Sequence, residues 1–181
     1  MKKDKIVQFV GFITNLNFDE FVTAWDSFAK RFVKNHEDTI LHQQFETKNR
    51  FKYVSQHEWA QQDFQFSFME GRTSEYFPEH SVKVVQAGGY TPLQIEWKQQ
   101  EDNGLVKVLA FISHRENDIA FYSQITLHRY LNIYEAFYQS CTYAYILEFF
   151  VEEAQTPDLL RLLKTRASIE TGIFKECLVT H

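Results

Sequence analysis

The sequence predicts an α+β protein built from ferredoxin-like antiparallel sheets with helices on one face. Two observations predict this class. An amphipathic helical segment follows an N-terminal strand-like run, and the order strand, helix, strand, strand, helix, strand can be read over the first half of the chain. The second half again alternates strand and helix patterns, without an equivalent of the first hairpin. We therefore expect a degenerate tandem, with modules at 1–90 and 91–181, that forms a dimeric α+β barrel-like arrangement in one chain.

The first strand and helix carry the clearest patterns. Residues 6–14 are rich in Val, Phe and Ile, which is typical of a buried strand. Asn17 followed three residues later by Glu20 predicts a capping box, and a helix is expected over about 18–35. Apolar residues at the spacing of one helical face are Phe18, Phe21, Val22, Trp25, Phe28, Ala29, Phe32 and Val33.

The rest of the first half completes the expected sheet. Strand-like runs at 40–47 and 50–55 predict a hairpin, and the aromatic and polar mixture of 56–69 predicts a second helix. A strand at 82–86 is expected to pair with 6–14. With both helices on one face, the other face of the sheet stays bare, and a second module or a partner subunit must cover it.

The second half begins with a bend or bulge at Gly88 and Gly89. Residues 93–98 are expected to pair with 106–113. A helix from near Leu127 is predicted by the helical spacing of its aromatic residues up to Tyr138. A strand over 143–152, a helix over 159–166 that Pro157 and Asp158 open, and a strand over 173–179 complete the chain.

Charge and cysteine content exclude several classes of protein. Nineteen Lys and Arg against 24 Asp and Glu give a net charge of −5, and the basic residues form no block beyond the first five residues. Nucleic acid is therefore not expected as a partner. Cys141 and Cys177 cannot form a disulfide framework, and neither has a second ligand at metal-binding spacing. No signal peptide or membrane span is visible, so we expect no membrane partner and a cytoplasmic location. Monomer and homodimer both stay open.

The aromatic content of 17% is the unusual feature of the composition. Aromatic side chains can line an apolar ligand cavity or fill an ordinary core. His42 and Gln44 alternate on a predicted strand, so they point to one face and could anchor a ligand there. Trp25 and Trp59 would stack on a flat ligand if they faced the interior, and would otherwise pack on the sheet.

Catalytic signatures are missing from the sequence. No two histidines have the spacing of metal ligands on one helical face, so no metal site is predicted. Gly88 and Gly89 lack the helix and lysine of a phosphate-binding loop. No Ser-His-Asp order or glycine-flanked nucleophile is present. The sequence therefore assigns no catalytic residue.

Two segments carry a resemblance to a known family. The long helix at 18–36 after the first strand, and the run Phe-Lys-Tyr-Val-Ser-Gln-His-Glu-Trp at 51–59, resemble the antibiotic-biosynthesis-monooxygenase-like group of the dimeric α+β barrel superfamily. The resemblance covers residues 5–90 and implies a sheet that packs against another sheet around an interior cavity. Members include cofactor-free oxygenases of polycyclic aromatic substrates and haem-degrading oxygenases. The histidine that the haem-degrading branch uses has no match here, so we expect no cofactor.

Two hypotheses for function follow. In the first, the protein binds a small apolar or aromatic molecule in its barrel, and the resemblance implies cofactor-independent oxygenation of that molecule. In the second, aromatic side chains fill the interior, and the protein is a non-enzymatic structural or protein-interaction domain.

Overall fold

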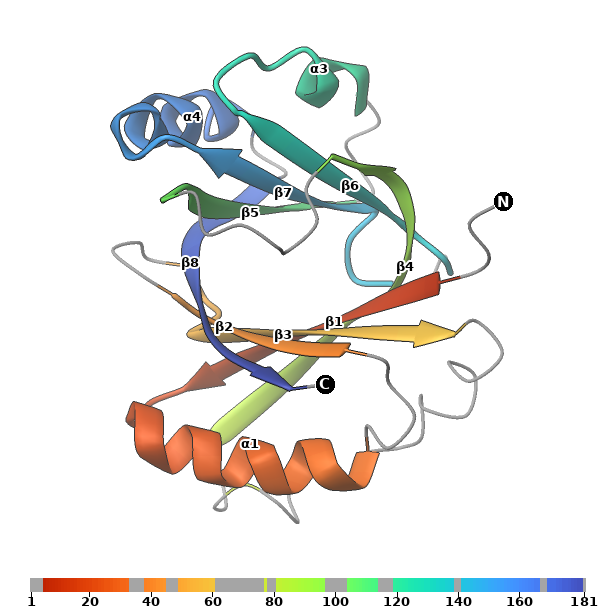
Figure 1. Ribbon diagram of the computed structural model, residues 1–181, viewed down its shortest axis with the longest axis vertical. Helices are drawn as coiled ribbons and strands as arrows, with labels where there is room; N and C mark the ends of the chain where they lie inside the picture. Colours follow the sequence, from red (N-terminus) through yellow and green to blue (C-terminus); the bar gives the residue numbers. More distant parts are fainter. Residues whose placement is uncertain are drawn as a thin grey trace.

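A computed structural model describes residues 5–32, 38–44, 49–60, 77, 81–96, 104–113, 119–138, 141–166 and 169–180. Eight strands form one closed barrel in the order β1-β3-β2-β8-β5-β7-β6-β4 (Figure 1). All strand pairs in it are antiparallel. The strands are β1 (Lys5–Thr14), β2 (Asp38–Gln44), β3 (Tyr53–Ala60), β4 (Val82–Ile95), β5 (Val106–Ile112), β6 (Tyr130–Ala136), β7 (Tyr145–Val151) and β8 (Ile169–Thr180).

The expected fold class is therefore wrong. The chain does not form ferredoxin-like sheets with helices on one face, because β2 pairs with β8 and β4 pairs with β6, so that every strand belongs to one ring. Closure leaves no free strand edge, and this gain depends on pairings between distant segments that local patterns do not encode. Each half contributes four neighbouring strands to the ring. The division into modules at 1–90 and 91–181 stays a prediction, and its boundary falls inside β4.

The helices lie on opposite sides of the barrel (Figure 1). Helix α1 (Phe18–Phe32) covers one side, while α3 (Ile119–Ser123) and α4 (Thr156–Leu163) lie on the other. Buried Phe21 and Trp25 of α1 pack with Phe12 of β1 and Tyr53 of β3. Leu159 of α4 and its neighbours pack in a separate cluster on the outer faces of β5, β6 and β7. The barrel is thus sandwiched between two outer apolar layers.

The start of α1 confirms the predicted capping box. The Asn17 backbone N–H donates to Glu20 Oε2 at 3.0 Å, and the Glu20 backbone N–H donates to Asn17 Oδ1 at 3.0 Å. Helix α4 spans Thr156–Leu163, three residues earlier than the expected 159–166, and Pro157 and Asp158 lie in its first turn. Helix α1 thus formed where a capping box and an apolar stripe agree, and α4 formed behind a first-turn proline without a side-chain cap.

Two predicted helices are corrected. The segment expected to be helical from near Leu127 contains β6, in which Leu131 and Ile133 face the outer layer and Asn132 and Tyr134 face inward. The first residues of the helix expected at 56–69 belong to β3, which continues to Ala60. Short aromatic runs fit the helical period and the strand period equally well, and in both segments pairing with neighbouring strands determines the structure. Residues 61–69 lie outside the described residues.

The predicted pairing of 93–98 with 106–113 is also wrong, because β4 pairs with β1 and β6 while β5 pairs with β7 and β8. The predicted irregularity at Gly88 is confirmed. Its φ is +119°, and the register of β4 against β1 shifts between Phe9 and Val10. A Cβ at Gly88 would lie 2.5 Å from Cys141 Sγ, so glycine is required there for space as well as for backbone conformation.

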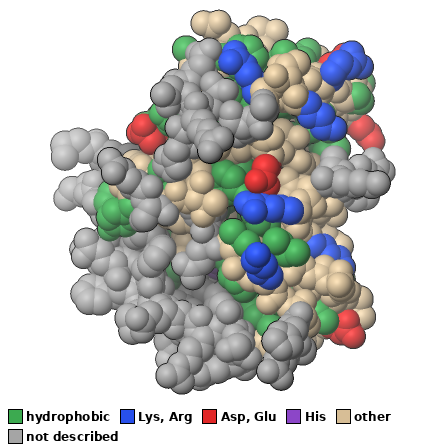
Figure 2. Space-filling view, turned by 180° about the vertical axis from the view of Figure 1, so that it is seen from behind, with side chains coloured by type: hydrophobic (Ala, Val, Ile, Leu, Met, Phe, Trp, Pro, Cys, Tyr) green, Lys and Arg blue, Asp and Glu red, His purple; other side chains and the backbone are tan. Residues whose placement is uncertain are grey.

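The surface mixes charges of both signs. Figure 2 shows Lys and Arg side chains beside Asp and Glu and among hydrophobic side chains over the described part of one face. Of the helices in the described ranges, none has both the length and the apolar character needed to cross a membrane.

Candidate functional site

The inward faces of the strands divide the barrel interior into two halves. Along β5, Lys107 lies near one end, Leu109 follows, and Phe111 lies near the other end. Along β7 the inward order is Phe150, Glu148 and Ile146, which pairs with the order on β5. On both strands, the charged residue thus lies on the same side of the apolar pair formed by Phe111 and Ile146.

One half, which we call the aromatic half, is packed with apolar rings. Phe111 lies 5.4 Å from Phe51 and 5.2 Å from Tyr143 between ring centroids. Phe9 lies 5.7 Å from Tyr90. Edge-to-face and tilted pairs at these distances stabilise a core beyond the area that they bury. The members of the aromatic half are Phe9, Phe51, Tyr90, Phe111, Tyr143 and Phe174.

The other half, which we call the polar half, contains buried polar and charged side chains. They come from strands around the ring and alternate with apolar residues that face the outer layers. Glutamate and lysine are almost never fully buried unless they are paired, so this concentration inside a barrel needs an explanation. The members of the polar half are His42, Gln56, Lys107, Asn132, Tyr134 and Glu148.

Hydrogen bonds join these residues into a chain. His42 Nε2 and Gln56 Oε1 are 3.2 Å apart, and Gln56 Nε2 donates to the Tyr134 hydroxyl at 3.4 Å. Tyr134 donates to Glu148 Oε2 at 2.8 Å, and Asn132 Nδ2 donates to the same oxygen at 2.9 Å. The chain leads from an imidazole to a carboxylate, both of which are buried.

The hydrogen bond to Gln56 fixes the tautomer of His42. Gln56 Oε1 only accepts hydrogen bonds, so the proton of the neutral ring lies on Nε2 and Nδ1 carries a lone pair. Nδ1 is buried and has no hydrogen-bond partner among the described residues. Burial, followed by the charge of Lys107, lowers the pKa of His42 well below its usual value, against the raising effect of Gln56. At neutral pH, His42 therefore offers an unprotonated nitrogen.

Tyr134 and Glu148 form the other end of the chain. Burial, followed by the neighbouring Glu148 charge, raises the pKa of Tyr134 well above its usual value, so its hydroxyl keeps its proton. Lys107 Nζ lies 3.7 Å from Glu148 Oε1 and 2.7 Å from Glu176 Oε1. The exposed fraction of the side chain rises from 3% at Glu148 through 9% at Lys107 to 32% at Glu176. Ionic groups thus connect the buried chain to solvent.

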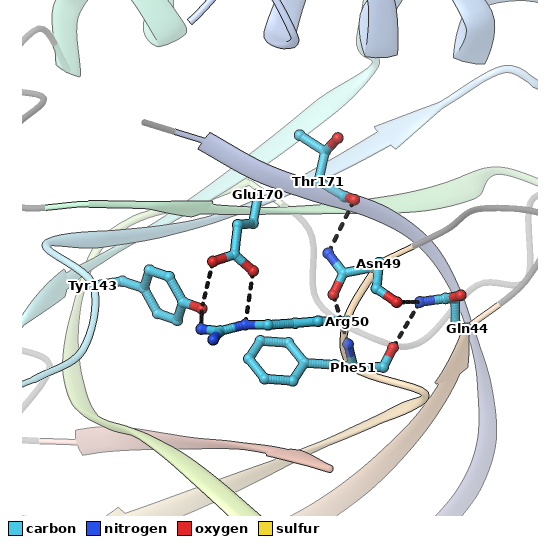
Figure 3. Close-up of polar contacts among 7 residues, drawn as sticks. All are labelled: Gln44, Asn49, Arg50, Phe51, Tyr143, Glu170 and Thr171. Atoms are coloured by element: carbon cyan, nitrogen blue, oxygen red, sulfur yellow. Dashed lines mark hydrogen bonds and ion pairs between the residues drawn. The ribbon is translucent and has the colours of Figure 1, made fainter. Parts of the chain in front are cut away.

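A second polar cluster borders the aromatic half (Figure 3). Arg50 Nε lies 2.8 Å from Glu170 Oε2, Arg50 also donates to the Tyr143 hydroxyl, and Tyr143 donates to Glu170 Oε1 at 3.3 Å. The Arg50 guanidinium lies over the Phe51 ring, 4.6 Å from its centroid. Burial raises the pKa of Tyr143 to about 12. These side chains bind one another, and none of them has a buried polar atom without a hydrogen-bond partner among the described residues.

The structure separates the four ligand-binding residues predicted from sequence. His42 faces the interior and belongs to the polar half. Gln44 donates instead to the backbone carbonyls of Asn49 at 2.9 Å and Phe51 at 2.7 Å, which holds the connection between β2 and β3 (Figure 3). Trp25 and Trp59 lie together in the outer cluster beneath α1, with Trp59 on a strand rather than on a helix.

Sequence reasoning missed Gln56, Lys107, Tyr134 and Glu148. A signal for one of them was present: Glu148 interrupts the otherwise apolar strand 146–151, where only a residue on the inward face with a buried partner could be tolerated. The partners could not be found, because they come from strands that are distant in sequence. Within the part of the chain that the structure describes, no three His, Cys, Asp or Glu side chains converge as metal ligands.

Comparisons with known proteins identify the fold alone. No protein-family model matches the sequence, and no curated protein matches it. Among solved structures, this chain is similar to an anthrone oxidase-like protein, with a TM-score of 0.56, 9% identity, and coverage of 99% of this chain and 94% of that chain. It is also similar to a mutant chlorite dismutase from Candidatus Nitrospira defluvii, with a TM-score of 0.50, 9% identity, and coverage of 97% and 93%. At 9% identity these likenesses show the fold, and the resemblance of residues 5–90 to the monooxygenase-like group stays a prediction.

Proposed function

We propose that the polar half of the barrel binds a small, flat aromatic molecule and that His42 serves as the base in its cofactor-independent oxygenation. One observation carries the proposal: a buried, neutral imidazole whose Nδ1 lone pair has no partner among the described residues. Leaving a buried acceptor unsatisfied costs about 1–3 kcal/mol. A ligand that supplies a proton or a hydrogen bond to Nδ1 would recover that free energy.

The surroundings of His42 suit an aromatic ligand. Tyr134 belongs to both halves, because its hydroxyl lies in the polar chain and its ring lies 5.2 Å from that of Phe9 in an edge-to-face arrangement. A flat molecule beside Tyr134 would meet an aromatic wall on one side and polar groups on the other, which is the usual composition of a ligand site. The similarity in fold to an anthrone oxidase-like protein suggests anthrones as a substrate class to test.

The proposed reaction requires only a base and dioxygen. In an anthrone, the ring CH₂ group opposite the carbonyl is acidic, and Nδ1 of His42 would remove one of its protons. The resulting carbanion reduces O₂ and forms a C–O bond, and protonation gives a hydroperoxide. Loss of the second C–H proton and cleavage of the O–O bond then give a ketone and water. The sum is anthrone plus O₂ to anthraquinone plus H₂O, and the proton that His42 takes up leaves in the water.

A second candidate function rests on the aromatic half. Its rings contact one another closely, with Phe51, Phe111 and Tyr143 in one connected group. If the whole interior is filled in this way, the protein is a structural or protein-interaction domain, and the polar half serves only specificity of folding. Ligand binding separates the two candidates.

The test combines binding with turnover. Anthrone is added to the full chain while the melting temperature and oxygen consumption are followed, because a ligand that binds only the native state raises the melting temperature. His42→Gln keeps a donor for Gln56 and removes the Nδ1 lone pair. His128→Gln is the matched control, because His128 also has a buried Nδ1 but lies beside Phe149 in the outer layer.

We expect wild type and His128→Gln to consume O₂ faster than buffer alone, and His42→Gln to lose at least 100-fold of that rate, as for a general base. Equal rates in wild type and His42→Gln would contradict the role of His42. The absence of both a thermal shift and oxygen uptake would favour the structural alternative.

A further inference from the structure

Resting on the proposed function, we infer that the ligand of the polar half is a neutral molecule that donates two hydrogen bonds, as a dihydroxylated aromatic does. The inference concerns which groups the site leaves open. It is carried by the unpartnered atoms of His42 and Glu148 and by the charges around Lys107.

Both open atoms are acceptors. His42 donates through Nε2 to Gln56, so its remaining ring nitrogen can only accept. Glu148 Oε2 already accepts from Asn132 and Tyr134, whereas Glu148 Oε1 has no hydrogen bond, and its nearest cation, Lys107 Nζ, is 3.7 Å away. That separation is beyond hydrogen-bond range. A ligand that brought donors to these two positions would satisfy both atoms.

Each donor group of the polar half already makes a hydrogen bond, and Lys107 Nζ donates to Glu176 Oε1 at 2.7 Å. Gln56 Nε2 donates to Tyr134, while Tyr134 and Asn132 donate to Glu148. A ligand that carries only carbonyl or ether oxygens would leave both open acceptors unsatisfied, so among anthrones the inference selects those that also carry ring hydroxyl groups. Sites built around a hydrogen-bonded hydroxyl discriminate strongly against analogues that lack it, for this reason.

Charge excludes a second class of ligand. Lys107 lies between the carboxylates of Glu148 and Glu176, so with all three ionised this group carries one excess negative charge. A carboxylate or sulfonate ligand would meet like charge in a region of low dielectric constant. A neutral phenol would not.

Three ligands with one ring system test the inference on the wild-type chain. They are 1,5-dihydroxynaphthalene, 1,5-dimethoxynaphthalene, which has the same rings without donors, and naphthalene-1,5-disulfonate, which is dianionic. Kd is measured for each by titration calorimetry. We expect the diol to bind at least tenfold more tightly than the dimethoxy compound, and the disulfonate to bind more weakly than either.

Two variants assign the effect to the open acceptors. His42→Gln and Glu148→Gln each should weaken the diol at least tenfold and leave the weak binding of the dimethoxy compound unchanged, while His128→Gln should change neither. Tighter binding of the dimethoxy compound or the disulfonate than of the diol would overturn the inference, and the proposed function would stand because a ligand still binds. If none of the three ligands binds while anthrone does, the inference alone fails. If anthrone also fails to bind or react, the proposed function fails with it.

Discussion

The two halves of the barrel interior solve the problem of burial differently. In the aromatic half, Phe111 and its neighbours meet one another in edge-to-face and tilted pairs, and every contact adds to stability. In the polar half, Lys107, Glu148 and His42 were brought out of water, and their mutual contacts only offset that cost. An apolar filling would hold the barrel closed at least as well. The comparison indicates that the aromatic half adds stability through its ring contacts, whereas the buried charges of the polar half mainly offset the cost of their own burial.

The largest predicted effect comes from the aromatic half. Phe111 is 1% exposed, so Phe111→Ala should lower the free energy of unfolding by about 3–5 kcal/mol through lost transfer free energy and a cavity. Urea denaturation measures it. Leu93→Ala is the control, because Leu93 is 54% exposed and its truncation should change stability by less than about 0.5 kcal/mol. A loss below about 1 kcal/mol for Phe111→Ala would show that the interior is not close-packed there.

Removing a charge from the polar half should lower the free energy of unfolding slightly less than Phe111→Ala does. Lys107→Met leaves the buried Glu148 without its cation, and breaking such a pair costs about 3 kcal/mol. The double variant Lys107→Met, Glu148→Gln should recover most of this loss, because glutamine keeps an acceptor for Tyr134 and carries no charge. Chemical denaturation of the single and double variants gives both values. If the double variant is as unstable as the single one, the pair stabilises the fold and the contrast between the halves is wrong.

The pH dependence of stability should report on His42. Its pKa is lowered in the folded protein. Below about pH 6.5, His42 is therefore protonated in the unfolded chain and stays neutral in the folded chain. Stability should therefore fall as pH decreases below about 6.5, by up to about 1.4 kcal/mol per pH unit. His42→Gln should flatten this part of the curve. His128, whose pKa is also lowered by burial, contributes a slope that both proteins share. Identical slopes in wild type and His42→Gln would contradict the burial of a neutral imidazole.

The smallest effect should come from the cluster that borders the aromatic half. Arg50 and Glu170 are each 41% exposed in their side chains, and half-exposed ion pairs are worth about 0–1 kcal/mol. Arg50→Met keeps an apolar side chain over Phe51 and should change the unfolding free energy by less than about 1 kcal/mol. A thermal unfolding series in increasing salt checks this value. A loss above about 2 kcal/mol would place this cluster, rather than the polar half, among the critical polar groups of the barrel.

The sequence predicted what local rules determine. Helix α1 was visible because its apolar stripe and the Asn17–Glu20 capping box agree, and α4 because Pro157 and Asp158 mark its first turn. The strand β6 was misread as a helix, because Tyr130, Leu131 and Tyr134 fit a helical period as well as a strand period. Residues 130–136 form a strand because they pair with β4 and β7, and no local sequence pattern encodes that pairing.

The candidate site was predictable only in part. His42 was singled out by its alternation on a strand, and it does face the interior. Its partner Gln56 had been placed in a helix, and Tyr134 on β6 and Glu148 on β7 lie 78 and 92 residues after Gln56. Barrel closure brings these strands together. Trp25 and Trp59 were candidates because of their large rings. Both pack in the outer cluster between α1 and the barrel, since large rings cover a sheet surface efficiently.

The proposed role of His42 as a base depends most directly on which ring nitrogen carries its proton. Nitrogen-15 NMR of the histidine side chains, with His42→Gln used to assign the signal, reports which ring nitrogen carries the proton. The account predicts a neutral His42 at pH 7 with the proton on Nε2 and an unprotonated Nδ1, which stays so to well below pH 6.5 and whose signal moves when 1,5-dihydroxynaphthalene is added. A ring that titrates near pH 6.5, or that carries its proton on Nδ1, would contradict it.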